Sequence, residues 1–242
     1  MGWLSCDLHI HSTLSPCGSL DMSPTQIVKK AREVGLDVIA VTDHNMTENS
    51  YYVCQAAKKY ELIVLSGMEL QTIEEIHLLA IFDDFEIAFD FQKQIYNLLP
   101  DIKNDPDYFG DQVVVNTSGE ILRYEEKLLL NSVQISINDA VKLIKSLGGI
   151  VIPSHIDSPT FSIVSQLGFV PDDIPFDAME VRHMDSVKDL LPFIMLKQIP
   201  FVTFSDAHYL TDIGCRRTML DVNEVNCREI AGAFKTLGRK LD

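Results

Sequence analysis

The stretch SPTQIVKKAREVGLDVIAVTDH (residues 23–44) contains a complete helix-to-strand unit. It opens with a serine, which is a favourable N-cap residue, and with a proline that suits the first turn of a helix. Apolar residues at helical spacing follow, and Gly35 ends the stripe. The next run, DVIAVT (37–42), has the length and apolar character of a strand buried on both faces. This unit predicts an α/β fold.

The same alternation of strands and helices runs through most of the chain. The predicted strands span residues 3–10, 37–42, 62–70, 76–82, 150–154, 178–182, 201–205 and 218–222. The predicted helices span residues 23–35, 47–60, 83–99, 136–147, 186–196 and 227–237. Repeated strand–helix units imply parallel pairing with right-handed crossovers. Seven or so strands of this kind suit a barrel or a strongly curled sheet.

One segment interrupts the alternation. Residues 113–115 and 121–124 have strand character and flank the turn-forming sequence NTSGE (116–120), which predicts a β-hairpin. We find no Gly/Ser linker and no internal repeat. The expectation is therefore a single α/β domain over residues 1–242, with an insertion at about 85–135 that contains the hairpin.

Composition and charge exclude several classes of protein. The chain has 242 residues and a formal net charge of −15, from 20 Lys and Arg against 35 Asp and Glu. Long nucleic acid held by surface charge is disfavoured, because such binding needs clustered basic residues. No stretch approaches the roughly 18 apolar residues of a membrane span, and Asp7 interrupts any secretion signal. The five cysteines are scattered, so we expect reduced thiols in a cytoplasmic protein.

Histidines and carboxylates gather where the predicted strands end. His9 and His11 lie two residues apart on one strand, so their side chains point to the same face. Further side chains of this kind are Asp7, Asp43, His44, Glu69, His77, His155, Asp206 and His208. In parallel α/β folds the carboxyl ends of the strands converge on one face. Imidazoles and carboxylates that converge there predict a transition-metal site with two or more ions.

Each of these residues also has an ordinary structural interpretation. An isolated H-x-H pair is usually a pair of common strand residues, Asp43 could be a helix N-cap, and His77 could be a hydrogen-bonded core histidine. The recurrence of the same residue types at the end of at least five strands favours the metal site over these alternatives. His183 falls outside the pattern, and we expect it in a loop.

Five motifs in chain order resemble those of the PHP (polymerase and histidinol phosphatase) family. They are DLHIH (7–11), GLDVIAVTDH (35–44), GME (67–69), SH (154–155) and SDAH (205–208). The resemblance implies a distorted (β/α)7 barrel with a metal site at the carboxyl ends of its strands. It also implies two or three divalent ions, usually zinc, manganese or iron, and hydrolysis of phosphoesters.

The resemblance further implies which residues hold the ions. The first ion would be held by His9, His11, Glu69 and Asp206. Glu69 would bridge to a second ion held also by His77 and His155, and His44 and His208 would hold a third. The family's usual further ligand after the H-x-H motif is missing, because SPCG (15–18) stands there with one residue inserted. Cys17 could be that ligand as a thiolate, or it could be inert and the third site weak or water-completed; Asp21 is a poorer substitute.

Residues that transfer protons and residues that bind the substrate are predicted around the ions. His208 or His44, where not fully committed to metal, could protonate the leaving alkoxide, and Asp43 and Asp7 are suited to orienting imidazoles. Three arginines, Arg182, Arg216 and Arg217, could clamp a second phosphate or a carboxylate of the substrate. The alternative for each arginine is ordinary surface charge.

These features together favour a metal-dependent phosphoesterase that uses a metal-bound hydroxide. The expected partner is a small phosphorylated substrate: a phosphomonoester, a nucleoside bisphosphate or a short oligonucleotide end. The alternatives are an amidohydrolase-like enzyme for another bond, a 5′–3′ exonuclease, and a non-catalytic metal-binding module. The insertion at 85–135 either covers the metal face and sets substrate choice, or is a surface hairpin that extends the barrel rim. No feature of the sequence defines the oligomeric state.

Overall fold

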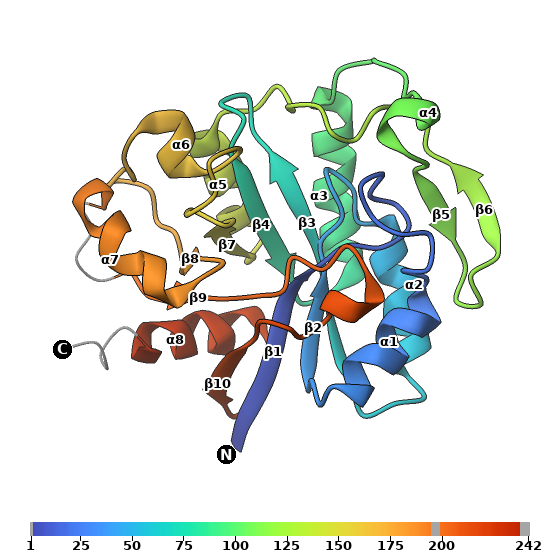
Figure 1. Ribbon diagram of the computed structural model, residues 1–242, viewed down its shortest axis with the longest axis horizontal. Helices are drawn as coiled ribbons and strands as arrows, with labels where there is room; N and C mark the ends of the chain where they lie inside the picture. Colours follow the sequence, from blue (N-terminus) through green and yellow to red (C-terminus); the bar gives the residue numbers. More distant parts are fainter. Residues whose placement is uncertain (1, 195–198, 238–242) are drawn as a thin grey trace.

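A six-stranded mixed sheet forms the centre of the protein (Figure 1) in a computed structural model that describes residues 2–194 and 199–237. The strand order is β10-β1-β2-β3-β4-β7. The strands are β1 Gly2–Ile10, β2 Val38–Val41, β3 Ile63–Gln71, β4 His77–Phe82, β7 Ile150–Pro153 and β10 Thr218–Val222. Two small sheets accompany it: β5 Val113–Val115 with β6 Ile121–Tyr124, and β8 Met179–Glu180 with β9 Phe201–Val202.

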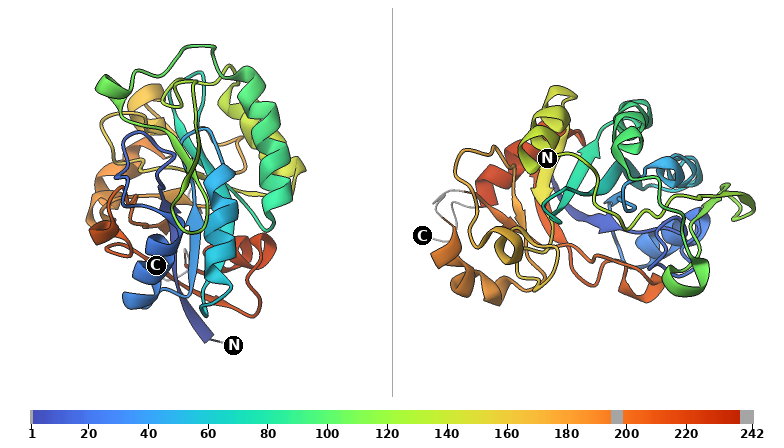
Figure 2. Two further views of the ribbon diagram at one scale, coloured as in Figure 1. Left: turned by 90° about the vertical axis from the view of Figure 1, so that its right-hand side faces the viewer. Right: turned by 90° about the horizontal axis from the view of Figure 1, so that it is seen from above.

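Helices surround the sheet on its outer side and at one end (Figure 2). The α-helices are α1 Pro24–Glu33, α2 Glu48–Ala57, α3 Phe85–Leu98, α4 Pro106–Phe109, α5 Ile137–Ser146, α6 Ile163–Leu167, α7 Val187–Leu190 and α8 Cys227–Leu237. Short 3₁₀ turns are η1 Met184–Ser186, η2 Leu191–Phe193 and η3 Leu210–Asp212. The helix predicted over 186–196 is broken into α7 and η2, since Pro192 cannot continue a helix, and its last two residues lie outside the described part of the chain. None of the described helices has both the length and the apolar character needed to cross a membrane.

The fold-deciding unit at 23–44 forms as predicted. Ser23 is the extended N-cap of α1, with Pro24 at the first helical position. Gly35 follows the helix with φ +78°, a conformation that suits glycine. Every residue of β2 is buried. Val38 and Ala40 belong to one apolar cluster and Ile39 and Val41 to another, so both faces of this strand are covered.

The expectation of parallel pairing is correct for only part of the main sheet. Strands β1, β2 and β3 are parallel, but β4 is antiparallel to both β3 and β7, and β10 is antiparallel to β1. Only residues 72–76 connect β3 to β4, with a hydrogen bond of 3.0 Å from the Thr72 N–H to the Ile76 carbonyl. That connection is too short for a parallel crossover. As a result β4 starts at the edge where β3 ends.

The main sheet is strongly curled, and backbone hydrogen bonds link its edge strand β7 through β8 and β9 to the carboxyl end of β1. The Asp177 N–H donates to the Val151 carbonyl beside β7. The Ala207 N–H donates to the His9 carbonyl of β1, and the His11 N–H donates to the Ala207 carbonyl. The segment after β9 therefore runs beside the carboxyl end of β1, although about 200 residues separate them in the sequence.

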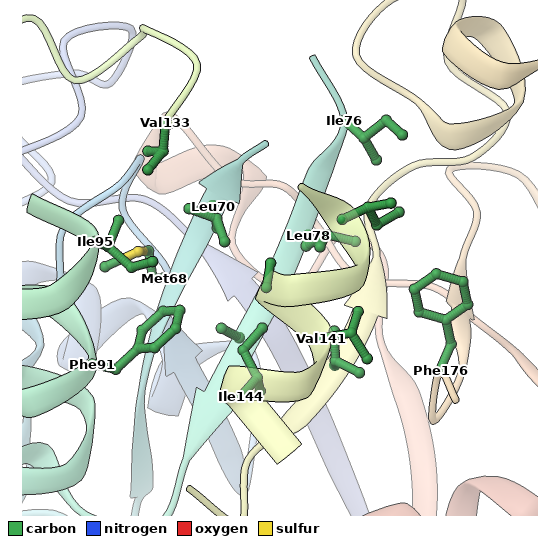
Figure 3. Close-up of a cluster of buried hydrophobic side chains, with 14 of the residues drawn as sticks. Met68, Leu70, Ile76, Leu78, Phe91, Ile95, Val133, Val141, Ile144 and Phe176 are labelled. Atoms are coloured by element: carbon green, nitrogen blue, oxygen red, sulfur yellow. The ribbon is translucent and has the colours of Figure 1, made fainter. Parts of the chain in front are cut away.

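Apolar layers fill both sides of the curled sheet. On β4, Leu79 and Ile81 point to the inner cluster, which α8 closes with Phe234. Their neighbours Leu78 and Ala80 belong to the outer cluster. This cluster also contains Phe91 of α3, beside Met68, and Val141 of α5 (Figure 3). This alternation explains why the strand sequences are continuously apolar.

The predicted hairpin pairs as β5 with β6, and it lies against the loops that follow β1 and β2. The Val113 N–H donates to the Thr13 carbonyl at 2.9 Å, and the Asn45 side chain donates to the Leu129 carbonyl at 2.7 Å. Helix α3 falls within the predicted 85–135 insertion, yet its Phe91 packs in the outer core. Val114 of β5 and the later residues Leu129 and Val133 belong to the same cluster, so the segment after Leu98 also contributes to the outer core.

Candidate metal centre

The candidate site lies at the edge of the sheet where β1 and β3 end and β4 begins. His9 is near the end of β1, Glu69 is near the end of β3, and His77 is the first residue of β4. The loops after β2, β7 and β9 supply His44, His155, Asp206 and His208. The structure therefore brings together the side chains that the sequence places at strand ends. His77, however, reaches it from the amino end of an antiparallel strand rather than from a carboxyl end.

The two histidines of the H-x-H motif face the same site. Strand β1 contains one extra residue relative to β2 between Asp7 and Ile10, a bulge of the kind that re-aims side chains. The Nε2 atoms of His9 and His11 lie 3.2 Å apart, and both rings are fully buried.

The carboxylate of Glu69 lies at the centre of five histidines. Its Oε1 is 3.3 Å from His9 Nε2, 3.0 Å from His77 Nδ1 and 3.3 Å from His155 Nε2. Its Oε2 is 3.4 Å from His11 Nε2 and 3.2 Å from His44 Nδ1. Burial acts to raise the pKa of Glu69, but the surrounding histidines hold that pKa well below its usual value. Glu69 is therefore an anionic group shared by several nitrogen ligands.

Asp206 and His208 approach from the segment after β9. The Asp206 Oδ1 lies 3.3 Å from both His9 Nε2 and His11 Nε2. Asp206 has φ +52° and His155 has φ +30°, left-handed conformations that non-glycine residues rarely adopt. The His208 ring stacks on His11 with centroids 4.2 Å apart. Strained backbone at both residues is typical of functional sites.

Hydrogen bonds fix which ring nitrogen carries the proton in three of these histidines. Glu180 Oε2 accepts from His9 Nδ1 at 3.0 Å, and the Asp206 carbonyl accepts from His208 Nδ1 at 2.8 Å. The Ser15 hydroxyl donates to Asp43 at 2.7 Å, so its oxygen accepts from His11 Nδ1 at 2.9 Å. Because each Nδ1 carries the proton, the neutral form of each imidazole has its Nε2 electron pair directed into the cluster. Burial acts to lower the pKa of His9, but the charges of Glu180, Glu69 and Asp206 raise it well above its usual value.

The donor set fits divalent transition-metal ions. In each of three groups the candidate ligand atoms lie within 4.8 Å of one another: His9, His11 and Asp206; His44, Glu69 and His77; and His11, His44 and His208. Among the described residues the buried Nδ1 of His44 has no hydrogen-bond partner, although it lies 3.2 Å from Glu69 Oε2, so this nitrogen is open to an ion. Burial lowers the pKa of His44 well below its usual value and, with the charge of His11, lowers that of His208 to about 4. Neutral imidazoles and carboxylates are ligands that zinc, manganese and iron accept.

Glu180 is a member of the site that the sequence reasoning missed. Its side chain is fully buried, and besides the His9 imidazole it accepts a hydrogen bond from the His155 N–H at 3.0 Å. The available signal was a lone glutamate within the apolar strand AMEV (178–181). A buried carboxylate of this kind needs polar partners, and here the partners are two of the candidate ligands.

The two aspartates expected to orient imidazoles have different roles. Asp43 reaches His11 only through Ser15, and it also accepts from the Ser12 N–H at 2.7 Å. Asp7 accepts from the Ser205 and Gly214 N–H groups, both at 2.9 Å, and no hydrogen bond in the described structure joins it to an imidazole. Burial raises the pKa of Asp7 to about 6. Asp7 therefore ties β1 to the segment that carries Asp206.

Cys17 lies outside the three ligand groups found in the described residues. It is exposed as a residue, yet the protein packed around its sulfur, together with the charge of Glu69, raises the pKa of its thiol to about 12. The group of His11, His44 and His208 brings three nitrogens to the predicted third site, although His11 also belongs to the group of the predicted first ion. The thiolate of Cys17 as a further ligand stays a prediction.

The three candidate substrate arginines differ in their surroundings. Arg216 donates to the carbonyls of Phe204 and Ser205, which directly precede Asp206. Arg217 donates to the Val34 carbonyl at 2.8 Å and to the Gly214 carbonyl at 2.9 Å. Both guanidinium groups are thus engaged by the backbone. Arg182 has its backbone N–H bound to Asp157, while its side chain is 40% exposed.

His183 is exposed where η1 begins, so the expectation of a loop position is correct. Its side chain is absent from the three ligand groups of the described residues.

A curled mixed sheet that carries buried imidazoles around one carboxylate is suited to holding divalent metal ions. Comparison with known proteins is more specific: the PHP domain family matches residues 7–156, and the chain belongs to this family. Among curated proteins, a DNA polymerase III of PolC type from Oceanobacillus iheyensis is 27% identical over 186 residues, covering 76% of this chain and 11% of that protein. An uncharacterized protein, MJ1587 of Methanocaldococcus jannaschii, is 30% identical over 79 residues, covering 29% of this chain and 46% of that protein. The chain therefore spans less than half the length of either relative.

Solved structures share the fold. A lesion-specific endonuclease, EndoQ from Pyrococcus furiosus, has a TM-score of 0.65 at 18% identity, covering 98% of this chain and 56% of that one. A putative metal-dependent phosphoesterase from Bifidobacterium adolescentis has a TM-score of 0.56 at 17% identity, covering 84% of this chain and 87% of that one. An amidohydrolase from Chromobacterium violaceum with bound sulfate has a TM-score of 0.58 at 17% identity, covering 89% of this chain and 91% of that one. The chain is thus like the PHP-family metal-dependent phosphoesterases in sequence pattern and fold.

Proposed function

We propose that the protein hydrolyses a small phosphorylated substrate with two or three divalent ions of zinc, manganese or iron. One observation carries this proposal: Glu69 is shared by five histidines, and hydrogen bonds hold the Nε2 electron pairs of His9 and His11 toward it. A carboxylate with this environment is suited to bridging two ions. We also infer that the ring of backbone hydrogen bonds from β7 through β8 and β9 to β1 corresponds to the distorted (β/α)7 barrel.

The ligand assignment follows the groups of the site. We assign His9, His11, Glu69 and Asp206 to one ion. We assign Glu69, His77 and His155 to a second, and His44 and His208, with His11 nearby, to a third. When bound, such ions activate water for attack and neutralise the charge of a phosphoryl group.

The chain's own residues position the ligands and handle the proton. Glu180 and Ser15 hold the imidazoles of His9 and His11 in one tautomer, and Asp43 holds Ser15. The side chain of His208 is 25% exposed, the most open of the site histidines that form ion pairs. With its Nδ1 proton on the Asp206 carbonyl, the Nε2 of His208 has an electron pair, so it either binds the third ion or, where it is not bound, takes up a proton and passes it to the leaving oxygen.

The substrate is expected to be small. The segment after Leu98 borders the site through Thr13 and Asn45, consistent with a wall that limits access. The net charge of −15 gives a polymer little attraction away from the metals. Of the three arginines, Arg182 is the one we retain as a substrate contact, because its guanidinium is partly exposed and its ion pair with Asp157 is long, with Nε 3.9 Å from Oδ1.

A DNA-cleaving activity is the second candidate. It is favoured by the TM-score of 0.65 to the lesion-specific endonuclease, whose fold matches 98% of this chain. The likeness shows a shared fold at 18% identity, so the substrate must be determined by assay.

The test is elemental analysis combined with a substrate panel. Purified protein is loaded with zinc, manganese or iron and assayed on phosphomonoesters, nucleoside bisphosphates, short RNA, duplex DNA with an abasic site, and amide and lactone substrates. We expect metal-dependent release of phosphate from the first two classes and of mononucleotides from short RNA, and neither from Glu69→Gln. Turnover of the abasic duplex alone would support the second candidate. Turnover of amides or lactones without any phosphoester would refute both.

A further inference from the structure

Phe161 places an aromatic ring directly beside the candidate metal centre. The residue lies in the loop between His155 and α6, which Figure 1 shows near the end of the sheet where β4 begins. Its ring is stacked on the imidazole of His77, with centroids 4.9 Å apart and planes inclined by 11°. His77 in turn is 3.0 Å from Glu69. One imidazole thus separates the ring from the centre of the site.

The backbone at Phe161 is held in an unfavourable conformation. Its φ is +55°, a left-handed value that a bulky side chain adopts only when its surroundings enforce it. On one side, the Phe161 carbonyl accepts a hydrogen bond of 2.9 Å from the His77 N–H. On the other, Ser162 caps α6 and its hydroxyl donates to the Ser158 carbonyl at 2.7 Å. The loop is therefore built to hold this ring in place.

Packing of the apolar core does not account for the ring's position. Phe161 is 39% exposed and belongs to none of the apolar clusters of the described residues. One face of the ring covers His77, and much of the rest is open to solvent. An open aromatic face held rigidly beside a polar site is a stacking surface for another planar group.

We propose that Phe161 is the platform on which the base of a nucleotide substrate stacks while its phosphate occupies the histidine cluster. The proposal rests on the phosphoesterase function proposed above and names its substrate class. In a nucleotide a sugar separates the phosphate from the planar base. Here one imidazole, that of His77, separates Glu69 from the Phe161 ring. A sugar phosphate without a base leaves the platform unused.

The test compares ligands that differ only in the base. A non-hydrolysable phosphonate analogue of AMP and ribose 5-phosphonate are titrated by calorimetry into the metal-loaded full chain. Phe161→Leu keeps an apolar side chain and removes the aromatic face. We expect it to weaken binding of the AMP analogue by roughly 5- to 100-fold. Binding of ribose 5-phosphonate and the metal content are expected to stay unchanged.

Phe169→Leu is the matched control, because Phe169 is also exposed, at 47%, and follows the same short helix. Kinetics on AMP are expected to show a raised KM with little change in kcat for Phe161→Leu alone. The same comparison is made with a dinucleotide. If Phe161→Leu weakens binding of the dinucleotide more than binding of the AMP analogue, the platform belongs to a site for the end of a nucleic-acid strand.

Two results would overturn the proposal separately. If Phe161→Leu weakens both phosphonates equally, or lowers the metal content, the ring only shields His77. If the wild type hydrolyses base-free phosphomonoesters with the same KM as nucleotides, base stacking is absent although the phosphoesterase function stands. If no phosphoester is hydrolysed by the wild type, the proposed function itself fails and the stacking proposal fails with it.

Discussion

Replacing Glu180 by glutamine tests whether a buried carboxylate sets the metal affinity of the site. The wild-type carboxylate accepts from His9 Nδ1 and from the His155 N–H, and its side chain is almost completely buried. Glutamine has nearly the same shape but only one acceptor oxygen. Oε2 accepts both of these bonds, so an amide nitrogen in its place repels the His155 N–H and the His9 Nδ1–H. An amide nitrogen in the place of Oε1 instead lies 3.1 Å from the His9 Nδ1–H, and the negative charge that favours this tautomer is lost in both cases.

Either outcome weakens a ligand of the predicted first ion. A residue that hydrogen-bonds to a metal ligand typically contributes 10- to 100-fold to metal affinity, which corresponds to about 1.4–2.7 kcal/mol of binding free energy. We expect a loss of that size when zinc is titrated against a fluorescent chelator. The matched control is Glu224→Gln, which changes an exposed carboxylate outside the three ligand groups and should leave the affinity unchanged.

A folding defect is separated from this effect by measuring the far-UV circular dichroism and the urea midpoint of the same samples in excess chelator. An unchanged zinc affinity in a folded Glu180→Gln protein would refute the reasoning that Glu180 fixes the tautomer of His9. Recovery of affinity in Glu180→Asp, which restores two acceptor oxygens on a shorter stem, would support it.

Three other expectations follow from the described contacts. Cys17→Ser should leave the number of bound ions unchanged by elemental analysis, because Cys17 is outside the ligand groups; loss of one ion would support the thiolate interpretation. Arg217→Met should lower the free energy of unfolding in urea by about 1–3 kcal/mol, because the carbonyls of Val34 and Gly214 lose a charged donor. A raised KM without a loss of stability would contradict this structural role. Chelation should lower the Tm of the wild type by about 5–10 °C if metal was present at 100 times its Kd, and should lower that of Glu69→Gln much less; equal shifts in both would argue against Glu69 as a ligand.

Much of the fold could be predicted because local patterns and tertiary packing agree. The run DVIAVT is apolar since α1 and α2 cover one face of β2 and the inner core covers the other. The direction of β4 could not be inferred from its apolar run, because a buried strand has the same apolar sequence pattern in parallel and antiparallel pairs. The decisive signal was the shortness of the 72–76 connection.

The site was predictable where side-chain type and strand position coincide, and not where a backbone group is the partner. Histidines at the ends of successive strands predict that their side chains lie close together at one edge of the sheet. Nothing in the sequence distinguishes Arg182 from Arg217, because the latter is engaged by the Val34 carbonyl across 183 positions of the chain. Glu180 was overlooked since a single glutamate in a strand is usually solvent-facing, and only the tertiary structure brings His9 against it.

The tight turn between β3 and β4 has a consequence for how the protein reaches its native state. Glu69 and His77 sit on adjacent antiparallel strands joined by residues 72–76, so their contact forms at short loop length. Asp206 joins His9 only after nearly the whole chain has been ordered. We expect amide protection in β3 and β4 to precede protection at 205–208 in pulse-labelling hydrogen exchange. A metal ion captured early by that hairpin would then act as a template on which the distant end of the chain closes.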